Sequence, residues 1–347
     1  MPKGARCDWA LRARMIYPLA VLALLAFALT APAGADTLLI GNKGENTVSF
    51  VDLKTGRECT RLPTGPQPHE IDLSPNGRQA AVVAYGGTTI DIFDVARARL
   101  VRRIDLSPGA GPHGIVWLSD GRIAIAAERS RSLEMVDPRS GSVRSIPLGQ
   151  NGPHMLAVAP DQRMAYVANI LSGTVSVVDL GKLKKVGDIP VGGNPEGIAI
   201  TRDGRQLWVG DDSRPHIRVV NIASQRTVDT LPIDSVAFRV AISPDGRTAV
   251  SSNLASGTLN LFDVASRRPL RTIRVSGDAK AMQVTLAFSR DGRRLFVAET
   301  MKDTIAEVDL GSGAVLRRIF AGRNGDGLAI APVDCRTPSQ REGQKRP

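Results

Sequence analysis

Three of the four histidines in the chain recur at matching positions of successive sequence repeats. They are His69, His113 and His154, and Glu196 occupies the corresponding position of the next repeat. Imidazole combined with carboxylate is a donor set that suits zinc, copper or iron. The pattern therefore predicts a ligand site made by these four residues, with a divalent transition metal as one candidate ligand. The alternative is that each histidine caps a turn by bonding to the backbone.

The repeat itself consists of an apolar residue followed by Asp or Asn, and it occurs seven times. Successive copies, beginning at Val51-Asp52 and ending at Val308-Asp309, are separated by 42, 43, 42, 42, 42 and 46 residues. Polar turns such as SPDGR at 243–247 lie between the copies, and Asp-Gly is a strong hairpin signal because glycine accepts a positive φ. A period of 40 to 45 residues with four short strands per unit is typical of a propeller. We predict an all-β, seven-bladed β-propeller with four antiparallel strands per blade.

The two ends of the repeat region are incomplete units that add up to one blade. Residues 38–40 align with the second strand of a unit, whereas residues 326–332 align with a first strand alone. We therefore expect the C-terminal strand to pair with the N-terminal strands, which removes the sheet edges that an open arc would expose. The expected organisation is a signal peptide at 1–35, the propeller at 36–335 and a disordered polar tail at 336–347.

The N-terminal segment has the features of an export signal. Four basic residues precede an apolar run at 16–29, and Ala33-Gly34-Ala35 supplies a small-residue cleavage pattern. An uncleaved membrane anchor is the alternative, but the run is short for a membrane span. We expect cleavage before Asp36, no membrane anchor after cleavage, and a periplasmic or secreted monomer with a net charge of +8, from 41 basic and 33 acidic residues.

Cysteine usage fits an oxidising compartment. Cys7 belongs to the expected signal peptide, which leaves Cys59 and Cys335 as an even pair and predicts a disulfide between them. The sequence contains no C-x-x-C-H haem motif, no P-loop, no G-x-S-x-G and no H-E-x-x-H. No catalytic set is therefore recognisable, and the catalytic residues, if any exist, are unknown at this point.

Several segments together resemble one family of repeat proteins. They are YVAN at 166–169, SGTVSVVDL at 172–180 and VGGNPEGIAI at 191–200, beside the SPDGR turn. The chain is similar to the YVTN β-propeller repeat family over essentially all of the region after the signal. The resemblance implies the propeller fold and an envelope or surface location. It does not imply one activity, because a fold carries many functions.

Aligning the seven units by the glycine of the polar turn gives one equivalent position at the start of each first strand, beside the expected axis. In chain order it holds His69, His113, His154, Glu196, Phe238, Val284 and Asp326. The loops between second and third strands emerge on the same face and bring Lys43, Tyr85 and Glu128. One mouth of the channel is thus predicted to bind a ligand, with Asp326 as a further ligand-binding candidate.

The opposite face is expected to be basic, because an arginine recurs at one position of the polar turns. These arginines are Arg78, Arg122, Arg163, Arg205, Arg247 and Arg293. They make either a solvated surface or an anion-binding face for a polyanion such as DNA. The leading hypothesis is an exported, non-catalytic binding or scaffold protein whose small-molecule, metal or protein ligand lies at the axial mouth. The alternatives are a metal-dependent hydrolase, lyase or oxidoreductase using the histidines and Glu196, and polyanion binding through the basic face.

Overall fold

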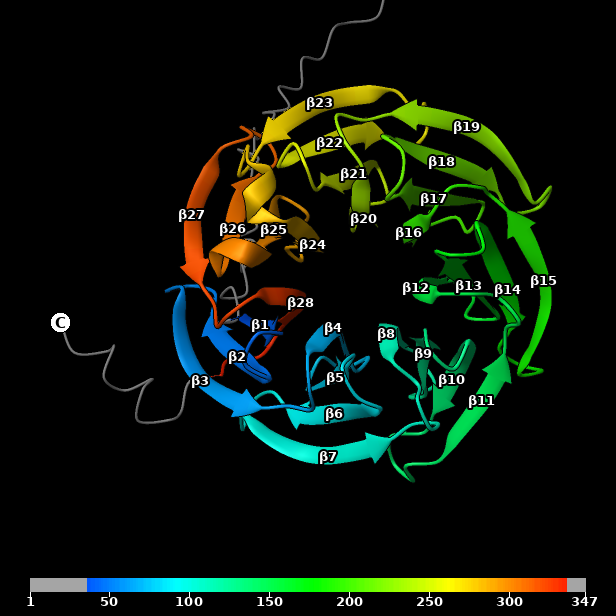
Figure 1. The fold of residues 1–347 in the computed structure, drawn as a ribbon. Helices are drawn as coiled ribbons and strands as arrows, with labels where there is room; N and C mark the ends of the chain where they lie inside the picture. Colours follow the sequence, from blue (N-terminus) through cyan, green and yellow to red (C-terminus); the bar gives the residue numbers. More distant parts are fainter. Residues whose placement is uncertain (1–35, 336–347) are drawn as a thin grey trace, which may run out of the picture. The chain divides into compact units, whose positions relative to one another are not determined.

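The computed structural model describes residues 36–335, which form seven four-stranded sheets arranged around a central axis (Figure 1). Every neighbouring pair of strands is antiparallel, as in the pairing of β5 with β4 and β6. The predicted fold class is confirmed. The expected signal peptide and the expected tail lie outside the described residues.

Each blade consists of strands a to d, with strand a nearest the axis (Figure 1). Blade 1 contains β4 (Pro68–Leu73), β5 (Gln79–Ala84), β6 (Thr89–Asp94) and β7 (Arg99–Asp105). Blade 2 contains β8 (Pro112–Trp117), β9 (Ile123–Ala127), β10 (Ser132–Val136) and β11 (Val143–Pro147). Blade 3 contains β12 (Pro153–Val158), β13 (Met164–Asn169), β14 (Thr174–Asp179) and β15 (Lys184–Pro190). Blade 4 contains β16 (Pro195–Ile200), β17 (Gln206–Asp211), β18 (His216–Asn221) and β19 (Arg226–Pro232).

The remaining blades follow the same order. Blade 5 contains β20 (Ala237–Ile242), β21 (Thr248–Asn253), β22 (Thr258–Asp263) and β23 (Pro269–Arg274). Blade 6 contains β24 (Gln283–Phe288), β25 (Arg294–Glu299), β26 (Thr304–Asp309) and β27 (Val315–Phe320), together with the short 3-10 helices η1 (Ala279–Ala281) and η2 (Thr300–Lys302). The closing blade contains β28 (Gly325–Ala331), β1 (Thr37–Asn42), β2 (Thr47–Asp52) and β3 (Arg57–Pro63).

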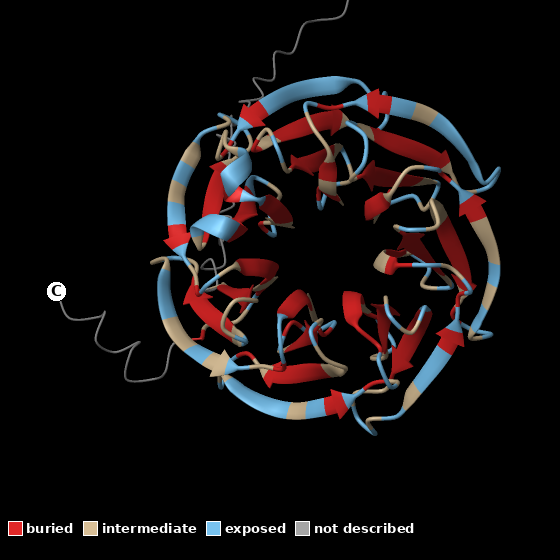
Figure 2. Ribbon diagram, viewed as in Figure 1, coloured by how far each residue is buried: buried red, intermediate tan, exposed pale blue. Residues whose placement is uncertain are grey.

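The core lies between neighbouring blades, which explains the continuous apolar runs in strands b. In β5, for example, Ala81 and Val83 pack toward blade 2, whereas Ala80 and Val82 pack toward the closing blade. A strand that is covered on both faces needs apolar residues at consecutive positions. The outermost strands d are largely exposed, in contrast to the buried inner strands (Figure 2).

The recurring polar turn is stabilised by its own aspartate. In blade 5 the hydroxyl of Ser243 donates to Oδ1 of Asp245 at 2.6 Å, and the backbone N–H of Arg247 donates to the same oxygen at 3.0 Å. Gly246 between them has φ +76°, a conformation that glycine adopts without strain. The turn chemistry therefore explains why Asp-Gly recurs at this place.

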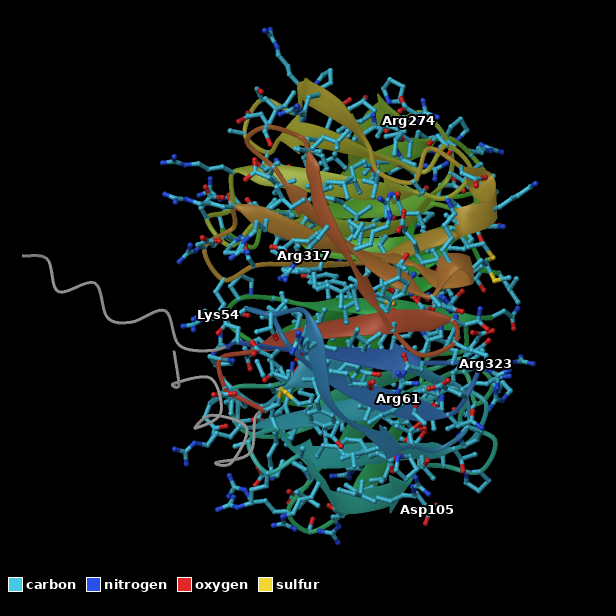
Figure 3. The ribbon with its side chains drawn as sticks, turned by 90° about the vertical axis from the view of Figure 1, so that its left-hand side faces the viewer. Lys54, Arg61, Asp105, Arg274, Arg317 and Arg323 are labelled. Carbon is cyan, nitrogen blue, oxygen red and sulfur yellow. A yellow bond between two sulfur atoms is a disulfide. The ribbon has the colours of Figure 1, made fainter. Side chains whose placement is uncertain are left out.

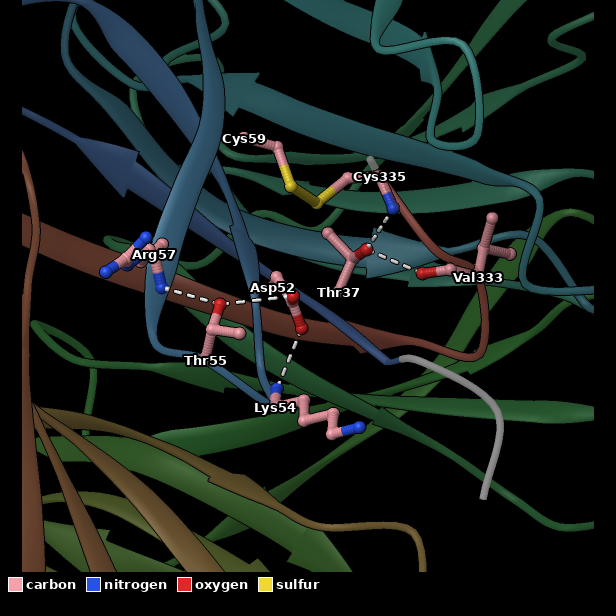
Figure 4. The surroundings of a disulfide bond; sticks show 8 residues. All are labelled: Thr37, Asp52, Lys54, Thr55, Arg57, Cys59, Val333 and Cys335. Carbon is pink, nitrogen blue, oxygen red and sulfur yellow. Dashed lines mark hydrogen bonds between the residues drawn. A yellow bond between two sulfur atoms is a disulfide. The ribbon is translucent and has the colours of Figure 1, made fainter. Parts of the chain in front are cut away.

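The ring is closed by the pairing of β28 with β1, as predicted from the two incomplete units. The register places Leu39 opposite Ala329. A disulfide joins Cys59 of β3 to Cys335, with their Cα atoms 6.1 Å apart, and confirms the predicted pair (Figure 4). Beside it the hydroxyl of Thr37 donates to the carbonyl of Val333 at 2.5 Å and accepts from the N–H of Cys335 at 3.0 Å.

The two faces of the ring carry different loops, which fixes where a site can form. Figure 3 shows Lys54, from a c–d turn, on one side, and Arg323, from the loop that leads into β28, on the other. The b–c loops lie on the same side as Arg323, because backbone N–H groups of Lys43 and Gly44 donate to the carbonyls of Asn324 and Arg323. Within residues 36–335 no helix is long and apolar enough to cross a membrane.

Candidate functional site: the axial mouth

A β-bulge at the start of each strand a turns side chains toward the axis. In blade 1 Pro68 pairs with Ala84 and Ile71 pairs with Val82, so His69 and Glu70 together oppose a single residue of strand b. The same one-residue excess occurs in the other six sheets. Bulges re-aim side chains in this way beside many functional sites. The second and third residues of each strand a therefore supply the mouth.

The bulges of neighbouring blades approach each other so closely that the third residue of strand a must be glycine in several blades. A Cβ atom built on Gly327 would lie 1.7 Å from the carbonyl oxygen of His69, and one on Gly114 would lie 2.7 Å from the carbonyl oxygen of His154. These distances leave no room for a side chain. Glycine in blade 2 and in the closing blade thus lets the backbones that carry the histidines lie close together.

The three histidines stack along the inner wall. The ring centroids of His69 and His113 are 4.0 Å apart, and those of His113 and His154 are 3.4 Å apart. Tyr85 stands edge-on to the first two rings. Burial and the neighbouring charges of His154 and His69 hold the pKa of His113 well below its usual value, so this imidazole is neutral.

His154 is held between two carboxylates. Its Nδ1 lies 3.1 Å from Oε2 of Glu128, and its Nε2 lies 3.1 Å from Oε1 of Glu196. Burial alone would lower the pKa of His154, but Glu196 and Glu128 outweigh burial and raise it. The hydroxyl of Tyr85 also donates to Oε2 of Glu128, at 3.1 Å.

Arg239 of β20 reaches across the axis and joins two blades. Its guanidinium contacts Oε1 of Glu196 at 2.8 Å and Oε1 of Glu70 at 2.5 Å, and only 5% of the residue is exposed. Burial would raise the pKa of Glu70, but Arg239 and His69 lower it to about 2. Burial would also raise the pKa of Glu196, yet His154 and Arg239 hold it below its usual value. The pKa of Arg239 is raised because Glu70 and Glu196 outweigh burial.

The other end of the network lies at the closing blade. Oδ2 of Asp326 is 2.5 Å from Nζ of Lys43 and 3.4 Å from Nε2 of His69, while its Oδ1 accepts from the hydroxyl of Thr285 at 2.7 Å. Burial would raise the pKa of Asp326, but His69, Lys43 and Arg239 hold it far below its usual range. A continuous polar network, which we call the axial network, therefore runs through Tyr85, Glu128, His154, Glu196, Arg239, Glu70, His69, Asp326 and Lys43.

The structure brings the sequence-predicted residues together at this mouth. His69, His113, His154, Glu196 and Asp326 all occupy second positions of their strands and contact one another directly or through one neighbour. Whether they bind a ligand stays a prediction.

The sequence analysis missed two residues of the axial network, Glu70 and Arg239. Each of them directly follows the residue of its blade that the repeat alignment selects. In blade 5 the aligned residue is Phe238, yet the side chain that enters the axis is Arg239. A signal was present, since five of the seven third positions carry Gly, Met or Thr and these two carry opposite charges.

On the opposite face the recurrent arginines follow the turn aspartates. Arg122 pairs with Asp120 at 2.7 Å, and Arg205 lies 3.9 Å from Asp203, so two of the predicted anion-binding side chains already face a carboxylate. Arg78, Arg163, Arg205, Arg247 and Arg293 are exposed. The anion-binding face stays a prediction, which salt-dependent binding to heparin would test.

A family model matches the chain. The model described as "Lactonase, 7-bladed beta-propeller" matches residues 41–228, more than half of the chain. The chain belongs to this family. Among curated protein sequences none matches this lactonase-family propeller.

Solved structures share its fold at low identity. Hydrazine synthase of Kuenenia stuttgartiensis is 17% identical with a TM-score of 0.66, covering 74% of this chain and 87% of its own. The dihydro-heme d1 dehydrogenase NirN, in complex with DHE, is 17% identical with a TM-score of 0.64, covering 84% and 74%. A functionally unknown protein from Desulfotomaculum acetoxidans DSM 771 is 13% identical with a TM-score of 0.70, covering 86% and 99%. At these identities the likeness shows the fold alone.

Proposed function

We propose that this chain is an exported binding protein of the cell envelope that takes a positively charged ligand at the axial mouth. One observation carries the proposal, the charge balance of the axial network. It contains four carboxylates but only two side chains with a permanent positive charge, Lys43 and Arg239. Over these fixed charges two negative charges are in excess, and each imidazole of the network that takes up a proton offsets one of them. Buried charge without a partner is costly, so the mouth favours a cation.

Export is supported by the cysteines and by the sequence. Disulfides persist in oxidising compartments, and the one between Cys59 and Cys335 fits such a location. The signal-like segment at 1–35 and the resemblance to the YVTN repeat family favour the same location. Cell fractionation with N-terminal sequencing tests this part, with a mature chain that begins at Asp36 as the expected result. A cytoplasmic, uncleaved chain would contradict it.

The binding part is tested by thermal unfolding of the chain with four probes: Zn²⁺, Ca²⁺, putrescine and gluconate. We expect cations to raise the melting temperature and gluconate to leave it unchanged. A ligand at a hundred times its Kd stabilises the folded state by about 2.7 kcal/mol. Glu128→Gln should weaken the response to putrescine, because it removes a negative charge that is partly accessible at the mouth.

Glu58→Gln is the matched control. Glu58 pairs with Arg61 at 2.8 Å on the exposed strand β3, away from the axial network. With every probe, the melting temperature of Glu58→Gln should change as it does in the wild type. No stabilisation by any cation, or an equal loss in both variants, would contradict the proposal.

Hydrolysis of a cyclic ester is a second candidate. The family's description names lactone hydrolysis, and the neutral imidazole of His113 has the protonation state that a general base needs. Titration of the acid released from glucono-δ-lactone tests this candidate. Turnover above the spontaneous rate that is lost in His113→Ala would support it, whereas equal rates with and without the chain would dismiss it.

A further inference from the structure

We propose that His69, Glu70 and His113 form a binding site for one divalent transition-metal ion at the axial mouth. This inference names the ligand of the proposed function and rests on it. One donor atom from each residue lies within 4.8 Å of the other two. Donors on a single ion lie at most about 4.2 Å apart, twice a typical bond of about 2.1 Å. Small side-chain rotations therefore suffice to bring all three donors onto one ion.

Two ring nitrogens at this place lack hydrogen-bond partners. Among residues 36–335 neither Nδ1 of His69 nor Nδ1 of His113 makes a hydrogen bond, although both atoms are buried. Nδ1 of His69 faces Oε1 of Glu70 at 3.6 Å, the carboxylate proposed to share the ion. His113 is only 1% exposed. A histidine that merely caps a turn would use such a nitrogen on a backbone group, which neither residue does. Buried nitrogens without partners fit metal ligands, because a bound ion satisfies both at once.

The surroundings of His69 also fit. The other nitrogen of His69, Nε2, lies 3.4 Å from Oδ2 of Asp326 and 3.4 Å from Nζ of Lys43. A carboxylate on the far nitrogen of a metal-bound histidine orients the ring and increases its basicity. Asp326 is thus a positioning residue for His69.

In this proposal His154 and Glu196 are not ligands of the ion, in contrast to the set predicted from the sequence. Both nitrogens of His154 face carboxylates, and Glu196 accepts from both His154 and Arg239. Glu70 and Glu196 each contact Arg239 through Oε1. Glu70 is the ligand because a carboxylate oxygen of Glu70, and not one of Glu196, lies within 4.8 Å of ring nitrogens of both His69 and His113. Glu196 supplies negative charge, and His154 packs against His113 in the stack of rings.

The donor set selects the class of metal. Two imidazole nitrogens and one carboxylate oxygen suit first-row ions such as Cu²⁺ and Zn²⁺, whereas Ca²⁺ and Mg²⁺ prefer sites made of oxygen. Affinity for such a site rises to Cu²⁺ and falls again at Zn²⁺. We therefore expect Cu²⁺ to bind more tightly than Zn²⁺, and both far more tightly than Ca²⁺.

The test uses the chain purified from the periplasm of an expression host without a histidine tag and stripped with a chelator. Isothermal titration with Cu²⁺ or Zn²⁺ should give one equivalent per chain. His113→Ala should weaken binding at least 30-fold, and the electron paramagnetic resonance spectrum of the copper form should show two coordinated nitrogens. His216→Ala is the matched control, because it removes the one remaining histidine, on β18 beside Asp211, and should bind as the wild type does.

Other outcomes would overturn the site. The site is contradicted if the wild type binds less than one metal ion per chain, or if His113→Ala binds the metal with unchanged affinity. It is also contradicted if His216→Ala loses as much metal affinity as His113→Ala. If His113→Ala does not fold, His69→Gln asks the same question and should lose binding likewise. If putrescine and Ca²⁺ stabilise the chain but Cu²⁺ and Zn²⁺ bind no more tightly than Ca²⁺, the metal site is wrong and the proposed function stands. If no cation binds, both are wrong.

Discussion

Replacing Arg239 with methionine should strongly destabilise the ring. The substitution keeps an unbranched side chain of similar length but removes the guanidinium that contacts Glu70 and Glu196. Two buried carboxylates then lose their shared cation. Removing one partner from a buried ion pair typically costs about 3–5 kcal/mol.

The expected change in melting temperature follows from the size of the described domain. Unfolding entropy is about 2.1 cal/mol/K per residue, which gives roughly 0.6 kcal/mol/K over residues 36–335. A loss of 3–5 kcal/mol should therefore lower the melting temperature by about 5–8 °C. Calorimetry, with chemical denaturation as a second measurement, is the assay.

Two further variants separate lost charge pairing from lost packing. Arg97→Met removes an exposed ion pair with Asp94 at 2.7 Å, where the arginine side chain is 71% exposed, and should cost less than about 1 kcal/mol. Adding Glu70→Gln and Glu196→Gln to Arg239→Met should restore much of the lost stability, because no uncompensated charge from these three residues remains buried. A melting temperature of Arg239→Met within 2 °C of the wild type, or a triple variant no better than the single one, would refute the reasoning.

Three other outcomes follow from the fold. Deleting residues 326–347 removes β28 and should abolish the cooperative unfolding transition seen by circular dichroism. Deleting only residues 336–347 should leave this transition intact. Identical transitions in the two variants would contradict the closure of the ring by β28 and β1. Gly327→Ala should lower the free energy of unfolding by about 1–3 kcal/mol, because the new Cβ would meet the backbone of His69. Gly187→Ala, where a Cβ has no atom within 4 Å, should change the free energy of unfolding by less than about 0.5 kcal/mol. Equal melting temperatures of the two variants would argue against the close approach of Gly327 to His69. Thiol labelling without reductant should find no reactive cysteine among residues 36–335, and reduction should cost up to about 5 kcal/mol for a bond that closes 276 residues; two free thiols would exclude the bond.

The fold was predictable because the repeat period, the turn motifs and the incomplete terminal units all indicate a closed seven-bladed propeller. The seven-fold period gave the blades, the Asp-Gly turns gave the hairpins, and the incomplete units at the two ends gave the pairing of β28 with β1. The disulfide could be predicted because only Cys59 and Cys335 remain after the expected signal peptide. Periodic patterns specify strands and their order well.

The candidate site was predictable only as far as the repeat alignment reached. The alignment found His69 and its equivalents because they share one column, but it could not show that a bulge also turns the next residue toward the axis. Glu70 and Arg239 were missed for this reason. Nor could spacing show that His154 is held between two carboxylates while His113 has a free nitrogen, because these differences arise from contacts between blades far apart in the sequence.

Anomalous X-ray diffraction at the zinc absorption edge tests the central claim most directly. Crystals of the chain grown with one equivalent of Zn²⁺ would locate the ion without reference to any variant. We predict one strong peak at the axial mouth, within bonding distance of His69, Glu70 and His113. Peaks confined to carboxylates on the outer surface, or no peak at the mouth, would contradict the account.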